Sequence, residues 1–101
     1  MKRIFYKPKD GWVGDVIPFY DQGEYKLYYL HDKREEGDYG NHTTWNLITT
    51  NDFLQFREHG VSLLNGTEDE PDRNAYTGSV IKGRDEKYHL FYTGHNPNPS
   101  F

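Results

Sequence analysis

The chain repeats two of its segments, Gly14-Asp15-Val16-Ile17 and Tyr25-Lys26-Leu27-Tyr28-Tyr29, as Gly78-Ser79-Val80-Ile81 and Tyr88-His89-Leu90-Phe91-Tyr92. The offsets are 64 and 63 residues, so one deleted residue in the connecting turn reconciles the two copies, which share six identical pairs. This pattern predicts two related hairpins. A four-stranded unit of this length is typical of a β-propeller blade, which needs neighbours to cover both of its faces. The alternative is that two aromatic hairpins resemble each other without being repeats.

Short runs of β-branched and aromatic residues recur along the chain between clusters of Gly, Pro, Asn and Asp. Nowhere do apolar positions keep helical spacing for three turns, so the sequence predicts an all-β fold. Hairpin turns are expected at Gln22-Gly23 and Arg84-Asp85, and long surface loops at Asp32 to Asn41 and Asn65 to Asn74. The expected strands are Arg3 to Lys7, Asp15 to Tyr20, Glu24 to His31, Thr43 to Thr50, Val61 to Leu64, Gly78 to Lys82 and Lys87 to Thr93.

Aromatic residues supply half of the hydrophobic content, 17% of the 101 residues against 34%, and the mean hydropathy is -1.03. Tyr and Trp bury their rings while the hydroxyl or indole N–H still needs water or a partner. This composition suits half-exposed strands and sugar-binding clefts. A domain of this size hides only about 60 to 65% of its unfolded surface, so we expect marginal stability for the chain alone.

Charge and composition argue against several classes of partner. The net charge is -4 with no run of Lys and Arg, which disfavours nucleic-acid binding, and no apolar stretch of membrane-spanning length occurs. Met1 to Lys9 lacks the apolar core of a secretory signal, so a cytoplasmic location is expected. The chain has no Cys, its five His are scattered, and Glu68 to Asp72 lacks the ligand spacing of calcium loops. We therefore expect no metal and no cofactor.

Asp15 is the conspicuous carboxylate, because it stands between Gly14 and the apolar pair Val16-Ile17, three residues after Trp12. The common role of such an Asp is to bond its own backbone at a turn or strand end. If Asp15 faces a sugar-sized cleft instead, apolar walls would suit a glycosidase nucleophile or base. His31-Asp32 has two similar interpretations, a hydroxyl-binding site or a solvated loop pair.

Four ordered stretches carry a family resemblance. Trp12 to Asp15 and Tyr25 to Tyr29 are similar to the motifs W-M-N-D-P-N-G and Y-H-L-F-Y, and Trp45 to Phe56 is similar to W-G-H-A-x-S-x-D-L-x-x-W with Phe in place of the last Trp. Asn74 to Val80 is similar to N-G-C-F-S-G-S-A, and the likeness closes on Leu90 to His95. On these matches the chain resembles the start of the five-bladed propellers of glycoside hydrolase family 32 and the related family 43.

The resemblance implies roles for single residues. Asp15 aligns with the family 32 nucleophile, which attacks the anomeric carbon of a fructosyl unit, and with the general base of family 43. The segment Tyr76, Thr77 and Ser79 matches a sugar-contacting stretch, and Trp12 and Trp45 match aromatic positions near the cleft. The alternative for all of these residues except Asp15 is packing between blades. With Asp32, the candidate substrate-binding residues are Trp12, Asp32, Trp45, Tyr76, Thr77 and Ser79.

Departures from the motifs limit what the resemblance implies. Gly14, Val16, Ile17 and Leu30 stand where the family has Asn, Pro, Asn and Gln, so strict invertase specificity is not expected. The family's R-D-P and E-C segments, which carry the transition-state stabiliser and the acid/base, do not occur in the chain. Without a general acid a catalyst loses on the order of 10² to 10⁴ in rate, so we expect the chain alone to be inactive.

We therefore interpret residues 1–101 as blade 1 and much of blade 2 of a propeller, with the remaining blades or a second copy of the chain as partner. The exposed faces of a blade would invite such association. The alternative from a different class is a noncatalytic carbohydrate-binding or scaffold module whose aromatic face stacks on sugar rings.

Overall fold

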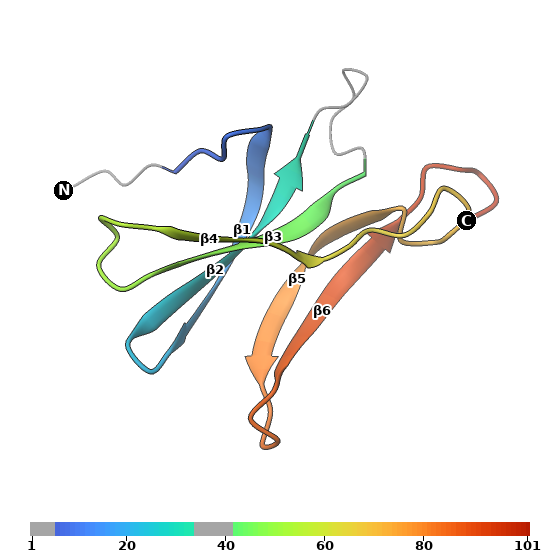
Figure 1. The fold of residues 1–101 in the computed structure, drawn as a ribbon. Helices are drawn as coiled ribbons and strands as arrows, with labels where there is room; N and C mark the ends of the chain where they lie inside the picture. The colour runs from blue at the N-terminus through green and yellow to red at the C-terminus, as the bar shows by residue number, and fades with distance from the viewer. Residues whose placement is uncertain (1–5, 34–41) are drawn as a thin grey trace.

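The computed structural model describes residues 6–33 and 42–101, which contain six β-strands and no helix, as the all-β prediction required (Figure 1). No helix that could cross a membrane occurs in these two ranges. The strands are β1 (Trp12–Asp21), β2 (Glu24–Asp32), β3 (Thr44–Thr50), β4 (Arg57–Leu63), β5 (Asn74–Lys82) and β6 (Tyr88–His95).

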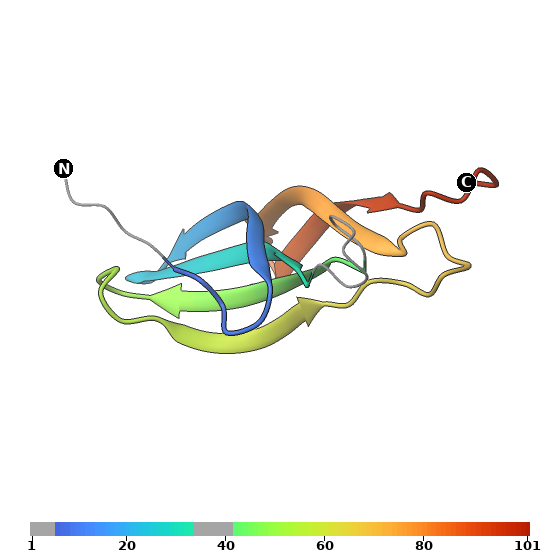
Figure 2. The same cartoon turned by 90° about the horizontal axis from the view of Figure 1, so that it is seen from above.

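The first four strands form one antiparallel sheet in the order β1-β2-β3-β4, and β5 pairs with β6 in a separate hairpin. Figure 2 shows the four strands following one another in chain order, with the hairpin beyond them. Gln22 and Gly23 form the first turn with φ angles of 50° and 79°, the left-handed pair that a two-residue hairpin turn needs. At the second turn Gly83 donates its backbone N–H to Lys87, which leaves the three residues 84–86 in the bend. Both hairpins expected from the sequence are thus present.

The hairpin covers one face of the four-stranded sheet. Because side chains alternate between the two faces along each strand, every second residue of the sheet points toward the hairpin. From the sheet, Ile17, Tyr28 and Trp45 enter a core that Ala75 and Val80 of β5 complete. We call this the covered face. Partly buried side chains around this core are Phe19, Leu30, Leu47, Leu63, Tyr88 and Leu90.

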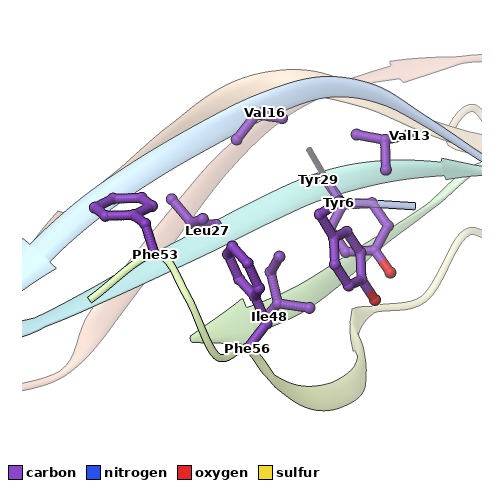
Figure 3. A pocket seen from close by; sticks show the side chains of 8 residues that line it. All are labelled: Tyr6, Val13, Val16, Leu27, Tyr29, Ile48, Phe53 and Phe56. Carbon is purple, nitrogen blue, oxygen red and sulfur yellow. The ribbon is translucent and has the colours of Figure 1, made fainter. Parts of the chain in front are cut away.

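The opposite face of the same sheet is also apolar, and we call it the open face. Its side chains surround a groove of about 330 Å³. Figure 3 shows these side chains, with the ring of Tyr6 among them from the segment before β1. A single sheet that is apolar on both faces needs a cover on each side, as a propeller blade does. The open groove is lined by Tyr6, Val13, Val16, Leu27, Tyr29, Ile48, Phe53 and Phe56.

A β-bulge interrupts the first strand of each hairpin near the same place. In β1 the residues Gly14 and Asp15 together face one position of β2, and in β5 Thr77 is the extra residue. Counted from the bulge, β1 and β5 correspond at an offset of 62 residues rather than the 64 of the sequence repeat. The two offsets differ by two residues. Because side chains alternate with a period of two, this shift changes which residues correspond but leaves each side chain on the face that the sequence repeat predicts.

Several expected strand boundaries were wrong. β1 begins at Trp12 rather than Asp15, and β5 begins at Asn74 rather than Gly78. Residues 3–5 of the expected Arg3 to Lys7 strand lie outside the described residues, and Tyr6 and Lys7 are not in a strand. Tyr6 meets the sheet through its ring, which packs on Tyr29 and Phe56, and through its hydroxyl, which donates to Glu58 over 2.7 Å. The strand expected at Val61 begins four residues earlier, because the left-handed Gly60 interrupts its hydrophobic pattern without ending the pairing with β3. Of the expected loop Asp32 to Asn41, residues 34–41 are not described.

Candidate active site

One end of the molecule gathers most of the residues that the sequence singled out. The amino ends of β1, β3 and β5 meet the carboxyl ends of β2 and β6 there, while both hairpin turns lie at the opposite end (Figure 1). This arrangement follows from antiparallel pairing, because each hairpin returns its second strand to the end from which the first one started.

The two bulges lie at this end, and they hold Asp15 on β1 and Thr77 on β5. A bulge redirects side chains at the edge of a sheet and is common beside active sites. Both side chains are solvent-exposed, and Asp15 itself does not line the open groove, although its neighbours Val13 and Val16 do. The strand β1 is an edge of its sheet and lies next to β5, so the two bulged segments come from adjacent strands.

Trp12 and Asp32 face each other across the first rung of the β1–β2 ladder. The indole of Trp12 is 47% exposed and carries the ammonium group of Lys7 at 4.4 Å from its ring centroid. Asp32 is half-buried. An accessible aromatic ring beside a carboxylate can stack on the apolar face of a sugar and accept hydrogen bonds from its hydroxyls.

Tyr76 lies at the same end on β5 and stacks on His95 of β6, with ring centroids 5.0 Å apart and an interplanar angle of 15°. Burial raises the pKa of the Tyr76 hydroxyl, and the negative charge of Asp32 raises it further. The phenol therefore stays protonated, so it remains able to donate a hydrogen bond. Sequence reasoning missed His95, because the register that brings it opposite β5 depends on the length of the second turn.

Trp45 corrects one expectation. Its side chain is fully buried in the core between the sheet and the hairpin, so it offers no surface to a ligand and the packing alternative holds for this residue. Its indole donates to the backbone carbonyl of Tyr76, and the backbone of Ala75 donates to Thr43 over 2.9 Å. These bonds attach the start of β5 to the start of β3 and thereby hold Tyr76 at the site.

Ser79 lies apart from the others, opposite Phe91 on the exposed outer face of the hairpin. The structure therefore brings together Trp12, Asp15, Asp32, Tyr76 and Thr77 at one end, and leaves out Trp45 and Ser79. No group of three His, Asp or Glu side chains suited to a metal ion occurs among the described residues.

Comparison with known proteins identifies the family. The model of the glycosyl hydrolases family 32 N-terminal domain matches residues 5–100. The chain belongs to glycoside hydrolase family 32. Its relatives include two proteins named levanbiose-producing levanase. The one from Bacillus subtilis is 33% identical over 75 residues, and the one from Geobacillus stearothermophilus is 33% identical over 64 residues.

The alignments with these two family 32 relatives cover 71% and 63% of the chain but only 13% and 15% of the relatives' lengths. The N-terminal domain of family 32 is a β-propeller, and the all-β sheet and hairpin described above are consistent with a part of one. The family resemblance drawn from the motifs is thus confirmed. A sheet that presents apolar side chains on both faces is consistent with a blade that lies between two others.

Proposed function

We propose that this chain is part of a glycoside hydrolase that cleaves β-fructofuranosidic bonds in oligo- or polysaccharides, with Asp15 as the nucleophile or the base. In this proposal residues 1–101 form blade 1 and much of blade 2 of the catalytic propeller. Trp12, Asp32, Tyr76 and Thr77 bind the sugar beside Asp15. The observation that carries the proposal is the carboxylate of Asp15 at the bulge of the edge strand β1, at the end where the strand registers also place these four residues.

The chemistry of the site supports this function. As a nucleophile, an exposed carboxylate at Asp15 would attack the anomeric carbon and form a covalent glycosyl-enzyme bond while the leaving group takes a proton from an acid. The aromatic ring of Trp12 would stack on the sugar, and the Tyr76 phenol, kept protonated by burial and Asp32, would donate to a sugar oxygen. Two carboxylates about 5 to 5.5 Å apart would give retention, and about 6.5 to 9.5 Å would give inversion.

The proton donor is outside this chain in the proposal. No E-C segment occurs in the sequence, and the relatives that match are several times longer than the matched part. We therefore expect the 101-residue chain to bind fructosyl ligands at most and not to turn them over. Catalysis needs the remaining blades, which would bring the acid to the end of the propeller where Asp15 lies.

A chimera tests the proposal. The segment of the Bacillus subtilis levanase that aligns with this chain is replaced by the chain, and release of reducing sugar from levan is measured. We expect an active chimera, and we expect Asp15→Asn to lower kcat on the order of 10⁴-fold while substrate affinity is kept. The matched control is Asp69→Asn in the exposed loop before β5, which should not change kcat.

Two results would contradict the proposal. A folded chimera that keeps its rate with Asn at position 15 would show that this carboxylate is not catalytic. Equal loss of binding and turnover in Asp15→Asn would favour a carbohydrate-binding module instead.

A further inference from the structure

The chain enters β1 through a sharp turn that lies against the end of β2. Gly11, directly before β1, has a φ angle of 79°, in the left-handed region that favours glycine. A Cβ atom at this position would lie only 2.5 Å from the backbone carbonyl oxygen of Asp32, so a larger residue would force the backbone to move. Trp12 follows this turn at once and pairs with Asp32 in the first rung of the ladder.

His31 connects β2 to this turn. Its ring nitrogen Nε2 forms a hydrogen bond with the backbone carbonyl oxygen of Asp10. Because a carbonyl oxygen only accepts hydrogen bonds, Nε2 carries the proton and Nδ1 is left as an acceptor. His31 is only 7% exposed, and its ring packs edge-on against Tyr29 with centroids 6.1 Å apart. A ring buried this deeply offers no surface to a sugar, so a role of His31 in the site is an indirect one.

Packing alone does not explain a histidine at position 31. Its Nδ1 atom is buried and has no hydrogen-bond partner among the described residues. An unpaired polar atom in the interior destabilises a fold, and an apolar side chain of similar size would avoid that loss. The imidazole instead supplies a directed hydrogen bond from the end of β2 to Asp10. Positions where a fold tolerates such a loss are often functional ones.

This hydrogen bond acts on the short end of β1. The register between β1 and β2 is interrupted between Val13 and Val16, where the bulge carries Asp15. Two rungs of the ladder precede the bulge and six follow it. The bond from His31 to Asp10 holds the backbone just before those two rungs. It thereby fixes the short stretch of strand from which the bulge begins.

We propose that His31 is a positioning residue of the candidate active site. Through its hydrogen bond to the Asp10 carbonyl oxygen, it sets the path by which the chain enters β1. The placement of the Trp12 ring and of the Asp15 carboxylate follows from that path. The effect on catalysis rests on the proposed function, whereas the placement of Trp12 is tested without any substrate.

Two substitutions separate the hydrogen bond from the packing. His31→Leu keeps a similar volume but has no donor, whereas His31→Gln supplies an amide N–H for the same carbonyl oxygen. The matched control is His59→Leu, because His59 also bonds through its ring, to Oγ1 of Thr49 at 2.7 Å, but lies on β4 at the other edge of the sheet from β1. If His31→Leu does not fold, His31→Met replaces it, since the flexible thioether adapts to irregular space.

Fluorine NMR of the chain labelled with 5-fluorotryptophan gives the first readout. The chain has two Trp residues, so two signals are expected. The signal of the buried Trp45 reports whether the core is folded, and that of Trp12 reports the entry to β1. We expect His31→Leu to shift the Trp12 signal and to leave the Trp45 signal in place, and we expect both signals to stay in His31→Gln and in His59→Leu.

Two results of this measurement would overturn the proposal, whatever the activity. The first is a Trp12 signal that stays in place in His31→Leu, or that moves equally in His31→Gln. The second is loss of the folded Trp45 signal in both His31→Leu and His31→Met, which would show that His31 is needed for folding rather than for position.

Kinetics of the levanase chimera give the second readout. We expect His31→Leu to lower kcat on the order of 10²-fold, because a misplacement of about 1 Å has an effect of this size, and we expect His31→Gln to restore most of the rate. A merely structural role would lower Tm without this loss of kcat well below Tm. An active chimera whose kcat is unchanged in His31→Leu would refute the effect on catalysis. An unmodified chimera without activity would instead contradict the proposed function, and the Trp12 signal would then decide the placement.

Discussion

The indole Nε1 of Trp45 donates a hydrogen bond of 2.8 Å to the backbone carbonyl oxygen of Tyr76. The donor comes from the start of β3, an inner strand of the four-stranded sheet, and the acceptor lies on the first strand of the hairpin. The bond therefore joins the two layers at the end where the candidate site lies. The ring of Trp45 also packs against Tyr28, with centroids 6.1 Å apart.

Trp45→Ala should therefore destabilise the chain strongly. Removing a buried Trp costs about 3 to 5 kcal/mol, and for a chain of this size each kcal/mol lowers Tm by roughly 4 to 8 °C. Trp45→Phe fills most of the volume but leaves the Tyr76 carbonyl without its donor, which costs about 1 to 3 kcal/mol. Thermal melting followed by circular dichroism measures both. A Trp45→Phe variant that melts with the unmodified chain would show that the bond contributes nothing to stability.

The sequence marked Trp45 as a candidate residue but did not distinguish a role in sugar binding from packing in the core. An aromatic residue in a strand lies on one face or the other, and β3 is buried on both faces, so alternation could not decide between a cleft and a core. The burial of Trp45 depends on the hairpin 30 residues later in the chain. Trp12 and Tyr76 lie near the starts of β1 and β5, and their roles in sugar binding stay predictions.

Gly78→Ala is expected to be more disruptive than Gly14→Ala. A Cβ atom at Gly78 would lie 1.7 Å from the carbonyl oxygen of Phe91, a backbone atom that cannot move without breaking the hairpin. At Gly14 the nearest atom would be the Cβ of Leu30, at 3.1 Å, which needs only a small shift. Overpacking of this kind costs about 1 to 3 kcal/mol, so Gly78→Ala should lose at least that much stability. Urea unfolding compares the two, and equal midpoints would mean that the hairpin backbone adjusts freely.

Gly14 and Gly78 also show that the sequence repeat predicts the wrong register between the two hairpins. The sequence aligns Gly14 with Gly78, but the bulges align Asp15 with Thr77, two residues off that match. Hydrophobic alternation is unchanged by a shift of two residues, so the pattern fixes the faces and leaves the register open. The register depends on the turn, where three residues in the second hairpin replace two in the first.

Acid should weaken the contact between β1 and the hairpin. Asp21 accepts hydrogen bonds from the hydroxyl of Tyr88 at 2.5 Å and from the ammonium of Lys82 at 3.0 Å. The bond from Tyr88 has the larger effect, and together the two bonds hold the pKa of Asp21 below the usual 3.8. Because the folded pKa lies below the unfolded one, the stabilisation is complete above pH 3.8 and disappears as the pH falls through the folded pKa. Asp21→Asn should therefore melt below the unmodified chain near neutral pH. The Tm values of the unmodified chain and of Asp21→Asn, measured from about pH 2 to pH 7, should converge in acid. A difference in Tm that stays constant over this range would show that the charge of Asp21 does not cause it.

Trp12→Ala should weaken sugar binding without unfolding the protein. Nearly half of the indole is exposed, and one of its contacts is with the ammonium of Lys7, which contributes about 0.5 to 1 kcal/mol at an exposed site. Stability should thus fall by little, whereas loss of an aromatic anchor costs a binding site more than about 1 kcal/mol, which is several-fold in Kd. Calorimetric titration of levan oligosaccharides into the Asp15→Asn chimera separates binding from turnover. Leu54→Ala, which removes another exposed apolar side chain, is the matched control and should bind unchanged. Unaltered affinity in Trp12→Ala would remove this ring from the site and leave its contact with Lys7 as a structural one.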